Sequence, residues 1–405
     1  MAGQITLIEG GSVTTPRGFQ AGATYAGLKT FAEDKLDLGI IVSEAACSSA
    51  GVYTQSSIKS PSVTVTQEHI NGGSVRAVVV NAGIANCSVG HQGYLDAQEM
   101  TAIAGKKLGL EPSEVAVCST GVIGVELPMS LIRAGFDQIH IKTDGGHELA
   151  RAMMTTDTRP KEVAVSFEVD GKQAHVGGVT KGSGMIHPNM ATMLSFITTD
   201  AAVDKEFLDA ALREVADSSF NMMTVDGDTS TNDTLLVLAN GQAGNPTINE
   251  NSPDAAVFKQ ALMDVCVHLA REMARDGEGA TKLITVEVVG ATDVTNARKA
   301  ARTIASSNLV KSAVAGSDPN WGRIMMAVGR SGAVVEESNL DLFINGVCIM
   351  EEGKPVPFHR DAVVALMRGP EITLQLNLNL ANGEATAWGC DLTEEYVIIN
   401  SAYTT

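Results

Sequence analysis

Short apolar runs that favour β-strands alternate with amphipathic helical segments along the chain, and this alternation constrains the fold more than any other feature. The predicted strands cover residues 76–81, 115–118, 163–169, 193–198, 235–239, 283–289 and 372–380. Such a mixture of strands and helices predicts an α/β or α+β architecture. With 405 residues, of which 44% are hydrophobic, the chain can build a large core and hold two domains.

Residues 372–380 give the clearest strand pattern, because apolar side chains occupy every second position. One face of that strand is therefore expected to be buried. Asn382-Gly383 follows, and this pair is the commonest sequence of a tight hairpin turn. The sequence thus predicts a hairpin whose return strand covers residues 384–392.

Three segments carry the signals of helices. Asp204 precedes an apolar stripe that reaches Val215, so it is predicted to cap a helix there. Ser252-Pro253 has the N-cap and first-turn residues of a second helix, which Gly277 is predicted to end. A third stripe predicts a helix over residues 96–108.

Composition argues against several classes of function. The net charge of −18 argues against nucleic acid and anionic membranes as partners. No run of apolar residues is long enough to predict a membrane span, and the first residues show no signal-peptide pattern. Six scattered cysteines without paired spacing fit reduced thiols, so we expect a cytoplasmic protein.

Familiar catalytic and metal-binding motifs are missing from the sequence. The eight histidines show no ligand spacing, and neither a P-loop nor a GxSxG or HExxH motif occurs. We therefore expect no metal site and no cofactor.

The segment from Lys181 to Leu194 combines more reactive features than any other part of the chain. It contains a lysine, a Gly-rich turn, the Pro188-Asn189 step, and Thr192 just before an apolar run that favours a strand. A threonine that becomes the first residue of a new chain carries its own base, the α-amine. Thr192 is therefore a candidate N-terminal nucleophile; the alternative is an ordinary strand residue.

Thr192 can act in this way only if the Ala191–Thr192 bond is broken. Its hydroxyl can attack the carbonyl of Ala191 where the surrounding structure holds the peptide under strain. The freed amine has an ordinary pKa of about 7.7–8.0. A nearby cation such as Lys181 would lower that pKa towards neutrality, which suits a general base.

Residues 119–124, Ser-Thr-Gly-Val-Ile-Gly, directly follow the predicted strand 115–118. A Gly-containing turn at the end of a strand exposes backbone N–H groups, and these can stabilise an oxyanion during acyl transfer. The alternative for this segment is a simple turn.

Two further polar segments leave their roles open. Residues 221–234 hold three acids, two asparagines and five hydroxyls, which suit a cation site or a hydrogen-bonded network. The acid spacing does not match a calcium loop, so the network is the favoured interpretation. Residues 311–323 contain one of the two tryptophans and either line a pocket or anchor a loop. His187 is interpreted as a surface residue without a role.

Together these segments resemble the ornithine acetyltransferase family, the bifunctional glutamate N-acetyltransferases of arginine biosynthesis. The resemblance extends over nearly the whole chain. It includes, in order, residues 37–54, 81–93, 119–124, 153–161, 181–194, 224–233, 276–282, 317–324 and 399–405. Several independent blocks in the same order make the match specific.

The resemblance implies that the precursor cuts itself between Ala191 and Thr192 into an α chain, residues 1–191, and a β chain, residues 192–405. Thr192 then takes acetyl from N-acetylornithine and passes it to glutamate. Thr120 and Gly121 match the oxyanion-hole pair of the family. The positions that match its substrate-binding residues are Thr155, Lys181, Thr192, Glu278, Asn400 and Thr405.

The implied fold is a two-domain layered α/β sandwich, shared with self-processing DmpA-type aminopeptidases, and the implied assembly is α₂β₂ or larger. Some family members also accept acetyl-CoA as a donor, and no motif in this chain separates the two donors. Two other interpretations remain open. One is a self-cleaving aminopeptidase or amidase, in which water takes the acyl group, and the other is a non-catalytic amino-acid-binding protein.

Overall fold

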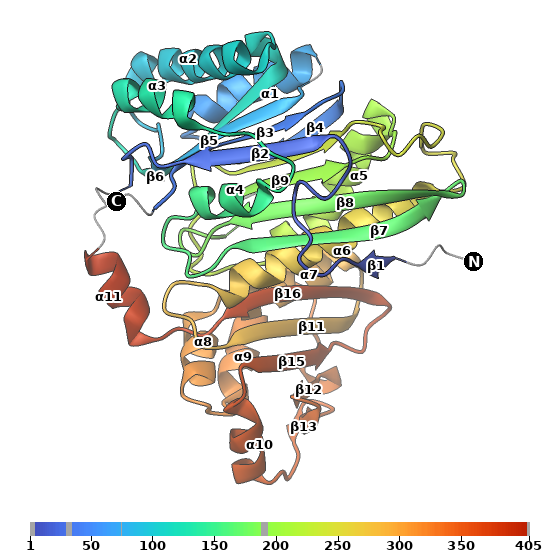
Figure 1. Ribbon diagram of the computed structural model, residues 1–405. Coiled ribbons are helices and arrows are strands. Elements are labelled where there is room, and N and C mark those ends of the chain that lie inside the picture. Colours follow the sequence, from blue (N-terminus) through green and yellow to red (C-terminus); the bar gives the residue numbers. More distant parts are fainter. Residues whose placement is uncertain (1–4, 30–34, 74, 188–192, 403–405) are drawn as a thin grey trace.

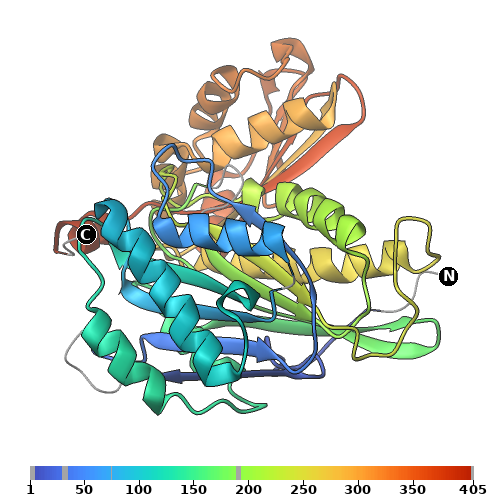
Figure 2. The same ribbon diagram turned by 90° about the horizontal axis from the view of Figure 1, so that it is seen from above.

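Three β-sheets and their helices stack into layers in a computed structural model of the protein (Figures 1 and 2). The structure describes residues 5–29, 35–73, 75–187 and 193–402. In Figure 1 the layers run from blue and teal segments at the top to orange and red segments at the bottom. The prediction of a layered α/β fold is confirmed.

The central sheet, sheet A, contains strands from both halves of the chain. In spatial order these are β1 (Thr6–Leu7), β7 (Lys161–Val169), β8 (Lys172–Lys181), β9 (Leu194–Thr199), β10 (Thr234–Ala239) and β4 (Ser48–Tyr53). Every residue of β9 and β10 is buried, as expected for strands covered on both faces. Leu194 pairs with Lys181 of antiparallel β8 and with Thr234 of parallel β10. The ends of three strands therefore meet at one end of sheet A.

Sheet B packs on one face of sheet A. It contains β2 (Phe19–Thr24), β3 (Leu38–Ser43), β5 (Ala77–Ile84) and β6 (Val115–Val122). The two sheets share an apolar cluster that includes Ile41 and Phe196, and α4 (Gly146–Met153) contacts both of them. The outer face of sheet B is covered by α1 (Pro61–Gly72), α2 (Gly90–Leu108) and α3 (Met129–Gln138) (Figure 1).

The other face of sheet A is covered by α5 (Lys205–Ser218) and α6 (Ala255–Arg275). Sheet C follows, with the order β14 (Lys354–Pro355), β13 (Val347–Glu351), β12 (Asp341–Ile344), β15 (Glu371–Asn377), β11 (Leu283–Ala291) and β16 (Gly383–Cys390). One apolar cluster runs from sheet A through α6 to sheet C and α7 (Val294–Ala305). The remaining helices are α8 (Asn308–Ala315), α9 (Trp321–Gly329), α10 (Arg360–Met367) and α11 (Glu394–Ala402), with short 3-10 turns at Pro112–Glu114, Phe220–Met222 and Glu337–Asn339.

Several sequence signals act as predicted. The Asp204 side chain accepts a hydrogen bond from the Phe207 amide at 3.1 Å and caps α5. The alternation in β15 buries Ile372, Leu374 and Leu376 on one face. The other predicted strands correspond to β5, β6, β7, β9, β10 and β11.

The hairpin predicted from Asn382-Gly383 is wrong. β11 lies between β15 and β16, paired in parallel with β15 and antiparallel with β16. The segment between β15 and β16 therefore connects two strands that are not neighbours. Glycine is still needed at position 383, because a Cβ there would lie 2.3 Å from the carbonyl carbon of Asp293.

Two predicted helix starts are displaced. α6 begins at Ala255, and the Ser252 hydroxyl instead accepts a hydrogen bond from the Asn249 amide at 2.9 Å. α2 begins at Gly90 rather than at Asp96, and no side chain caps its first turn. A helix that starts without a cap leaves no start signal in the sequence.

None of the six cysteines, all of which lie in the described part of the chain, forms a disulfide, and five of them are buried. Burial raises the pKa of Cys47 to about 11, so its thiol is protonated at neutral pH. Within the described part of the chain, no helix has both the length and the apolar character that crossing a membrane requires.

Candidate active site

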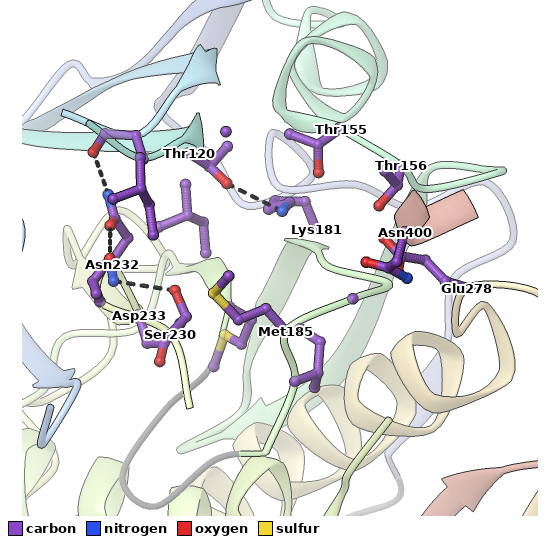
Figure 3. Close-up of a pocket in the computed structure, with 18 residues that line it drawn as sticks. Thr120, Thr155, Thr156, Lys181, Met185, Ser230, Asn232, Asp233, Glu278 and Asn400 are labelled. Atoms are coloured by element: carbon purple, nitrogen blue, oxygen red, sulfur yellow. Dashed lines mark hydrogen bonds between the residues drawn. The ribbon is translucent and has the colours of Figure 1, made fainter. Parts of the chain in front are cut away.

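A pocket opens at the end of sheet A where β8 stops and β9 begins (Figure 3). Six of the predicted site residues line it, namely Thr120, Gly121, Thr155, Lys181, Glu278 and Asn400. They come from β6, β8, α11 and the segments that follow α4 and α6. The predicted residues Ala191, Thr192 and Thr405 lie outside the residues that the structure describes. The fold thus brings together the predicted residues that it describes, although they lie far apart in sequence.

Lys181 is the last residue of β8, and its side chain lines the pocket (Figure 3). It is only 7% exposed, and its Nζ donates a hydrogen bond to Oγ1 of Thr120 at 3.1 Å. Burial lowers the pKa of Lys181 because the ammonium loses hydration, although Asp157, Asp233 and Glu278 favour the charged form. The Lys181 ammonium and the Thr120 hydroxyl are close enough to act on the same bound molecule.

A buried ion cluster supports the position of Lys181. Lys161 of β7 donates to Asp157 at 2.6 Å and also to Asp276, and all three side chains are almost completely buried. Asp157 accepts a further hydrogen bond at 2.7 Å from the amide of Gly182. Burial by itself raises the pKa of Asp157, but Lys161, Lys181 and the Gly182 amide outweigh it and hold that pKa well below its usual range. The cluster therefore fixes the backbone at the end of β8.

Thr120 and Gly121 belong to β6 itself, so the turn predicted for residues 119–124 is wrong. β6 continues to Val122 because β5 pairs with it, with an irregular register at Ile84. Gly121 has a φ of +130°, which L side chains rarely adopt. A Cβ at this position would lie 2.1 Å from the carbonyl carbon of Gly83. The close approach of β5 explains why glycine occupies position 121.

Glu278 supplies a carboxylate to the pocket. Asn400 of α11 donates its Nδ2 to Oε2 of Glu278 at 2.7 Å and so ties the last helix to the site. Gly184 leaves room for this carboxylate, since a Cβ there would lie 2.4 Å from its carboxyl carbon. Glu278 thus places an acidic side chain in the same pocket as the basic side chain of Lys181 (Figure 3). Such a pair suits a ligand that carries both charges.

Residues 221–234 form a hydrogen-bonded network, as the favoured interpretation predicts. Asp226 accepts hydrogen bonds from the amides of residues 185 and 186 at 2.6 and 2.9 Å. Asn232 donates to the carbonyl of Ser119 in β6 at 2.8 Å. The network thus joins the segment after β8 to sheet B. Among the described residues, no three side chains of His, Cys, Asp or Glu gather where a metal ion could bind.

Four pocket residues in this network are not predicted from the sequence, namely Ser230, Thr231, Asn232 and Asp233. Their only signal in the sequence is the density of polar side chains in residues 221–234. That density does not distinguish a side chain that faces a cavity from one that faces the loop itself.

Comparison with known proteins gives the relatives of the chain. Residues 20–405 match the model of the ArgJ family. This chain belongs to the ArgJ family. The arginine biosynthesis bifunctional protein ArgJ of Dehalococcoides mccartyi is 49% identical over 405 residues, which are 100% of both proteins. That of Bacillus subtilis is 46% identical over 396 residues, which are 98% of this chain and 97% of that protein.

Solved structures include members of the ArgJ family. The ArgJ protein of Bacillus halodurans is 44% identical with a TM-score of 0.51, and the match covers 51% of this chain and 98% of that one. The crystallised chain is therefore about half as long as this one. The ornithine acetyltransferase of Mycobacterium tuberculosis, solved with ornithine, is 36% identical with a TM-score of 0.42, over 46% of this chain and 100% of that one. The family predicted from the sequence is confirmed.

In this ArgJ-family chain His187 is half-buried, and its side chain has partners that the interpretation from sequence did not give it. Its Nδ1 lies 3.0 Å from Oγ1 of Thr224, and Arg302 of α7 donates to its Nε2 at 3.1 Å. Burial, and then the charge of Arg302, lower the pKa of His187 to about 4. The ring is therefore neutral at neutral pH and anchors the segment after β8 to α7.

Residues 311–323 anchor secondary structure rather than line the pocket. Lys311 of α8 is buried and donates to the carbonyl of Val225. Trp321 begins α9 and packs against the apolar cluster that reaches sheet C. The segment thus makes structural contacts and does not line the active-site pocket, although Ala313, Val314, Asp318 and Asn320 line a small separate cavity.

Proposed function

We propose that this chain transfers an acetyl group from N-acetylornithine to glutamate through an acetyl ester of Thr192, after cleaving its own Ala191–Thr192 bond. The observation that carries the proposal is the convergence of Lys181, Thr120 and Glu278 on one pocket, at the point where β8 ends and β9 begins. Arginine biosynthesis is the setting for which the relatives in the ArgJ family are named.

The charges of the pocket match those of N-acetylornithine, which carries a carboxylate and a side-chain ammonium. In this proposal Lys181 binds the carboxylate, and Glu278, held by Asn400, binds the ammonium. Thr155 adds a hydroxyl to the wall of the pocket. Thr405, at the end of the chain, is proposed to complete the substrate site.

The proposed reaction has two halves. The Thr192 hydroxyl attacks the acetyl carbonyl while the α-amine of Thr192 takes its proton. The Thr120 hydroxyl and the Gly121 amide donate hydrogen bonds to the oxyanion. The amine then returns the proton to the departing ornithine, and the acetyl ester remains on Thr192. Glutamate reverses these steps, because its amine attacks the ester and the threonine hydroxyl is regenerated.

Two observations support the proposed self-cleavage. β8 and β9 are neighbours in sheet A, so chains 1–191 and 192–405 can remain one folded body after the cut. The crystallised chain of the Bacillus halodurans relative is about half as long as this one, as expected for a processed polypeptide. Assembly into α₂β₂ or larger units belongs to the same proposal.

Steady-state kinetics and mass spectrometry test the transfer. We expect parallel double-reciprocal lines for N-acetylornithine and glutamate, because ornithine must leave before glutamate enters. N-acetylornithine alone should add one acetyl group to the peptide that begins at Thr192. Intersecting lines with an unmodified peptide would contradict the proposal. Release of free acetate in place of N-acetylglutamate would identify the enzyme as a hydrolase of the aminopeptidase or amidase type.

Acetyl-CoA is proposed as a second, slower donor. Its basis is that the relatives are named bifunctional proteins. Formation of N-acetylglutamate is to be compared between the two donors at the same concentration of glutamate. A faster reaction with acetyl-CoA would reverse the proposed order of the donors.

Thr120→Ala is expected to lower kcat about 10²-fold with little change in KM, because the hydroxyl is proposed to act on the oxyanion, which exists only beyond the ground state. Initial rates at saturating and limiting N-acetylornithine separate the two constants. Thr143→Ala, an exposed threonine outside the pocket, is the control and should behave as wild type. A rise in KM alone would assign Thr120 to substrate binding instead.

A further inference from the structure

Asp233 is a buried carboxyl group in the pocket wall, and the proposed reaction does not use it (Figure 3). The residue directly precedes β10 and is only 2% exposed. The Met193 amide and Ser230 lie near its carboxyl group and favour the ionised form. Its Oδ2 atom is buried and has no hydrogen-bond partner among the described residues. A carboxylate in such a place loses hydration that the protein only partly replaces.

Two opposing effects act on the protonation of Asp233. Burial favours the neutral form, and the charge of Lys181 favours the ionised form. Burial raises the pKa of Asp233 well above its usual range, and this effect outweighs the neighbouring polar groups and the charge of Lys181 on β8. Burial therefore favours the neutral form of Asp233 over its ionised form. The other carboxylates that act on Lys181 have partners of their own, since Asp157 is bound to Lys161 and Glu278 to Asn400.

We propose that Asp233 is a positioning residue that controls the charge of Lys181. In its neutral form it leaves the ammonium free for a substrate carboxylate, and in its ionised form it neutralises that ammonium. This inference rests on the proposed function for the identity of the anion, which is the carboxylate of N-acetylornithine or glutamate.

An ionised Asp233 would compete directly with the substrate, because both carboxylates favour the same buried ammonium. An ion pair formed inside the pocket leaves no net charge to attract an anion. The affinity for anions should therefore fall as the pH rises through the range in which Asp233 loses its proton. Because the pKa of Lys181 is itself lowered by burial, the two groups titrate as a coupled pair.

The test replaces Asp233 by asparagine, which keeps the size and a hydrogen-bond donor but cannot ionise. In the wild type, KM for glutamate should rise at alkaline pH with little change in kcat. In Asp233→Asn, KM at neutral pH should stay within about threefold of wild type, and the alkaline rise should move to higher pH, because only deprotonation of Lys181 remains. Asp209→Asn makes the same change on the exposed side of α5 and should leave the profile unchanged.

Two results would overturn the inference. Loss of acetyl transfer in Asp233→Asn at every pH would mean that Asp233 moves a proton in the reaction itself. An unchanged alkaline rise in KM would mean that Lys181 titrates without Asp233.

The stability of the protein, measured without substrate, tests this inference independently of the proposed function. An acid whose pKa is raised in the folded protein loses its stabilising contribution as the pH rises above its unfolded pKa of about 3.9. At about pH 7, Asp233→Asn should therefore have a higher denaturant midpoint than wild type, and the difference should vanish below about pH 4. Proton release when the wild type unfolds at about pH 6 gives the same information if the variant does not fold.

The two readouts fail in different ways. Equal midpoints, together with no proton release, would show that Asp233 is ionised, and the inference would then be wrong whatever the protein acetylates. If the midpoints are as expected but the wild type transfers no acetyl group, the result contradicts the proposed function. The inference that burial keeps Asp233 protonated would still hold.

Discussion

Thr192→Ala should leave the purified protein as one full-length polypeptide and lower acetyl transfer by about 10⁴-fold. The variant lacks the hydroxyl that is proposed to attack the carbonyl of Ala191 and later to carry the acetyl group. Without cleavage there is also no free α-amine to act as a base. A denaturing gel measures the first effect, and formation of N-acetylglutamate measures the second.

Thr192→Ser is the matched control, because serine keeps both the hydroxyl and, after cleavage, the amine. It should run as two fragments and retain measurable transfer. Two fragments from Thr192→Ala would contradict the proposal that this side chain cuts the chain. Full transfer by an uncut Thr192→Ala chain would remove Thr192 from the mechanism.

Lys161→Met is expected to lower the free energy of unfolding by about 3–5 kcal/mol. The change removes the ammonium that pairs with Asp157 at 2.6 Å and with Asp276, and it leaves two carboxylates buried. An exposed ion pair would cost far less, because water can replace the lost partner there. Chemical denaturation of the wild type and the variant measures the difference.

The pH dependence of this loss provides a second check. Because the pKa of Asp157 is held low in the folded wild type, its stabilisation is present above the unfolded pKa of about 3.9 and is lost as the pH falls through the folded pKa. In Lys161→Met, burial raises that pKa without opposition from Lys161, so the gap between variant and wild type should narrow below about pH 5.

Lys172→Met is the control for this experiment, because Lys172 is exposed at the start of β8. It should change the free energy of unfolding by less than about 0.5 kcal/mol. If Lys161→Met lowers the free energy of unfolding by no more than Lys172→Met does, the buried cluster contributes nothing to the stability of the fold.

The sequence predicts where the strands lie better than it predicts which strands pair with each other. Alternating apolar residues identify the buried face of β15, because the pattern depends only on local pleating. The partners of β15 are distant in the sequence: Leu283 of β11 lies opposite Glu371, and β11 takes the place that the local Asn382-Gly383 signal gives to β16. Turn residues favour a bend, but they do not determine which strands pair.

The candidate site shows the same division between local and distant information. Motifs identify Thr120, Lys181 and Glu278, and the fold brings them to one pocket. The conformation of Gly121 is not predicted, because it results from the approach of Gly83 in β5. Asp233 is also missed, since only burial separates it from the other acids in residues 221–234.

The pairing of β8 with β9 has a consequence for recovery from denaturation. In the intact precursor these two strands meet as parts of one polymer, so closing a short loop is enough to align them. After the proposed cleavage, the same contact becomes an encounter between separate molecules, and its rate depends on protein concentration. Renaturation of the mature enzyme should therefore slow on dilution, whereas the uncut precursor should refold at the same rate at any concentration.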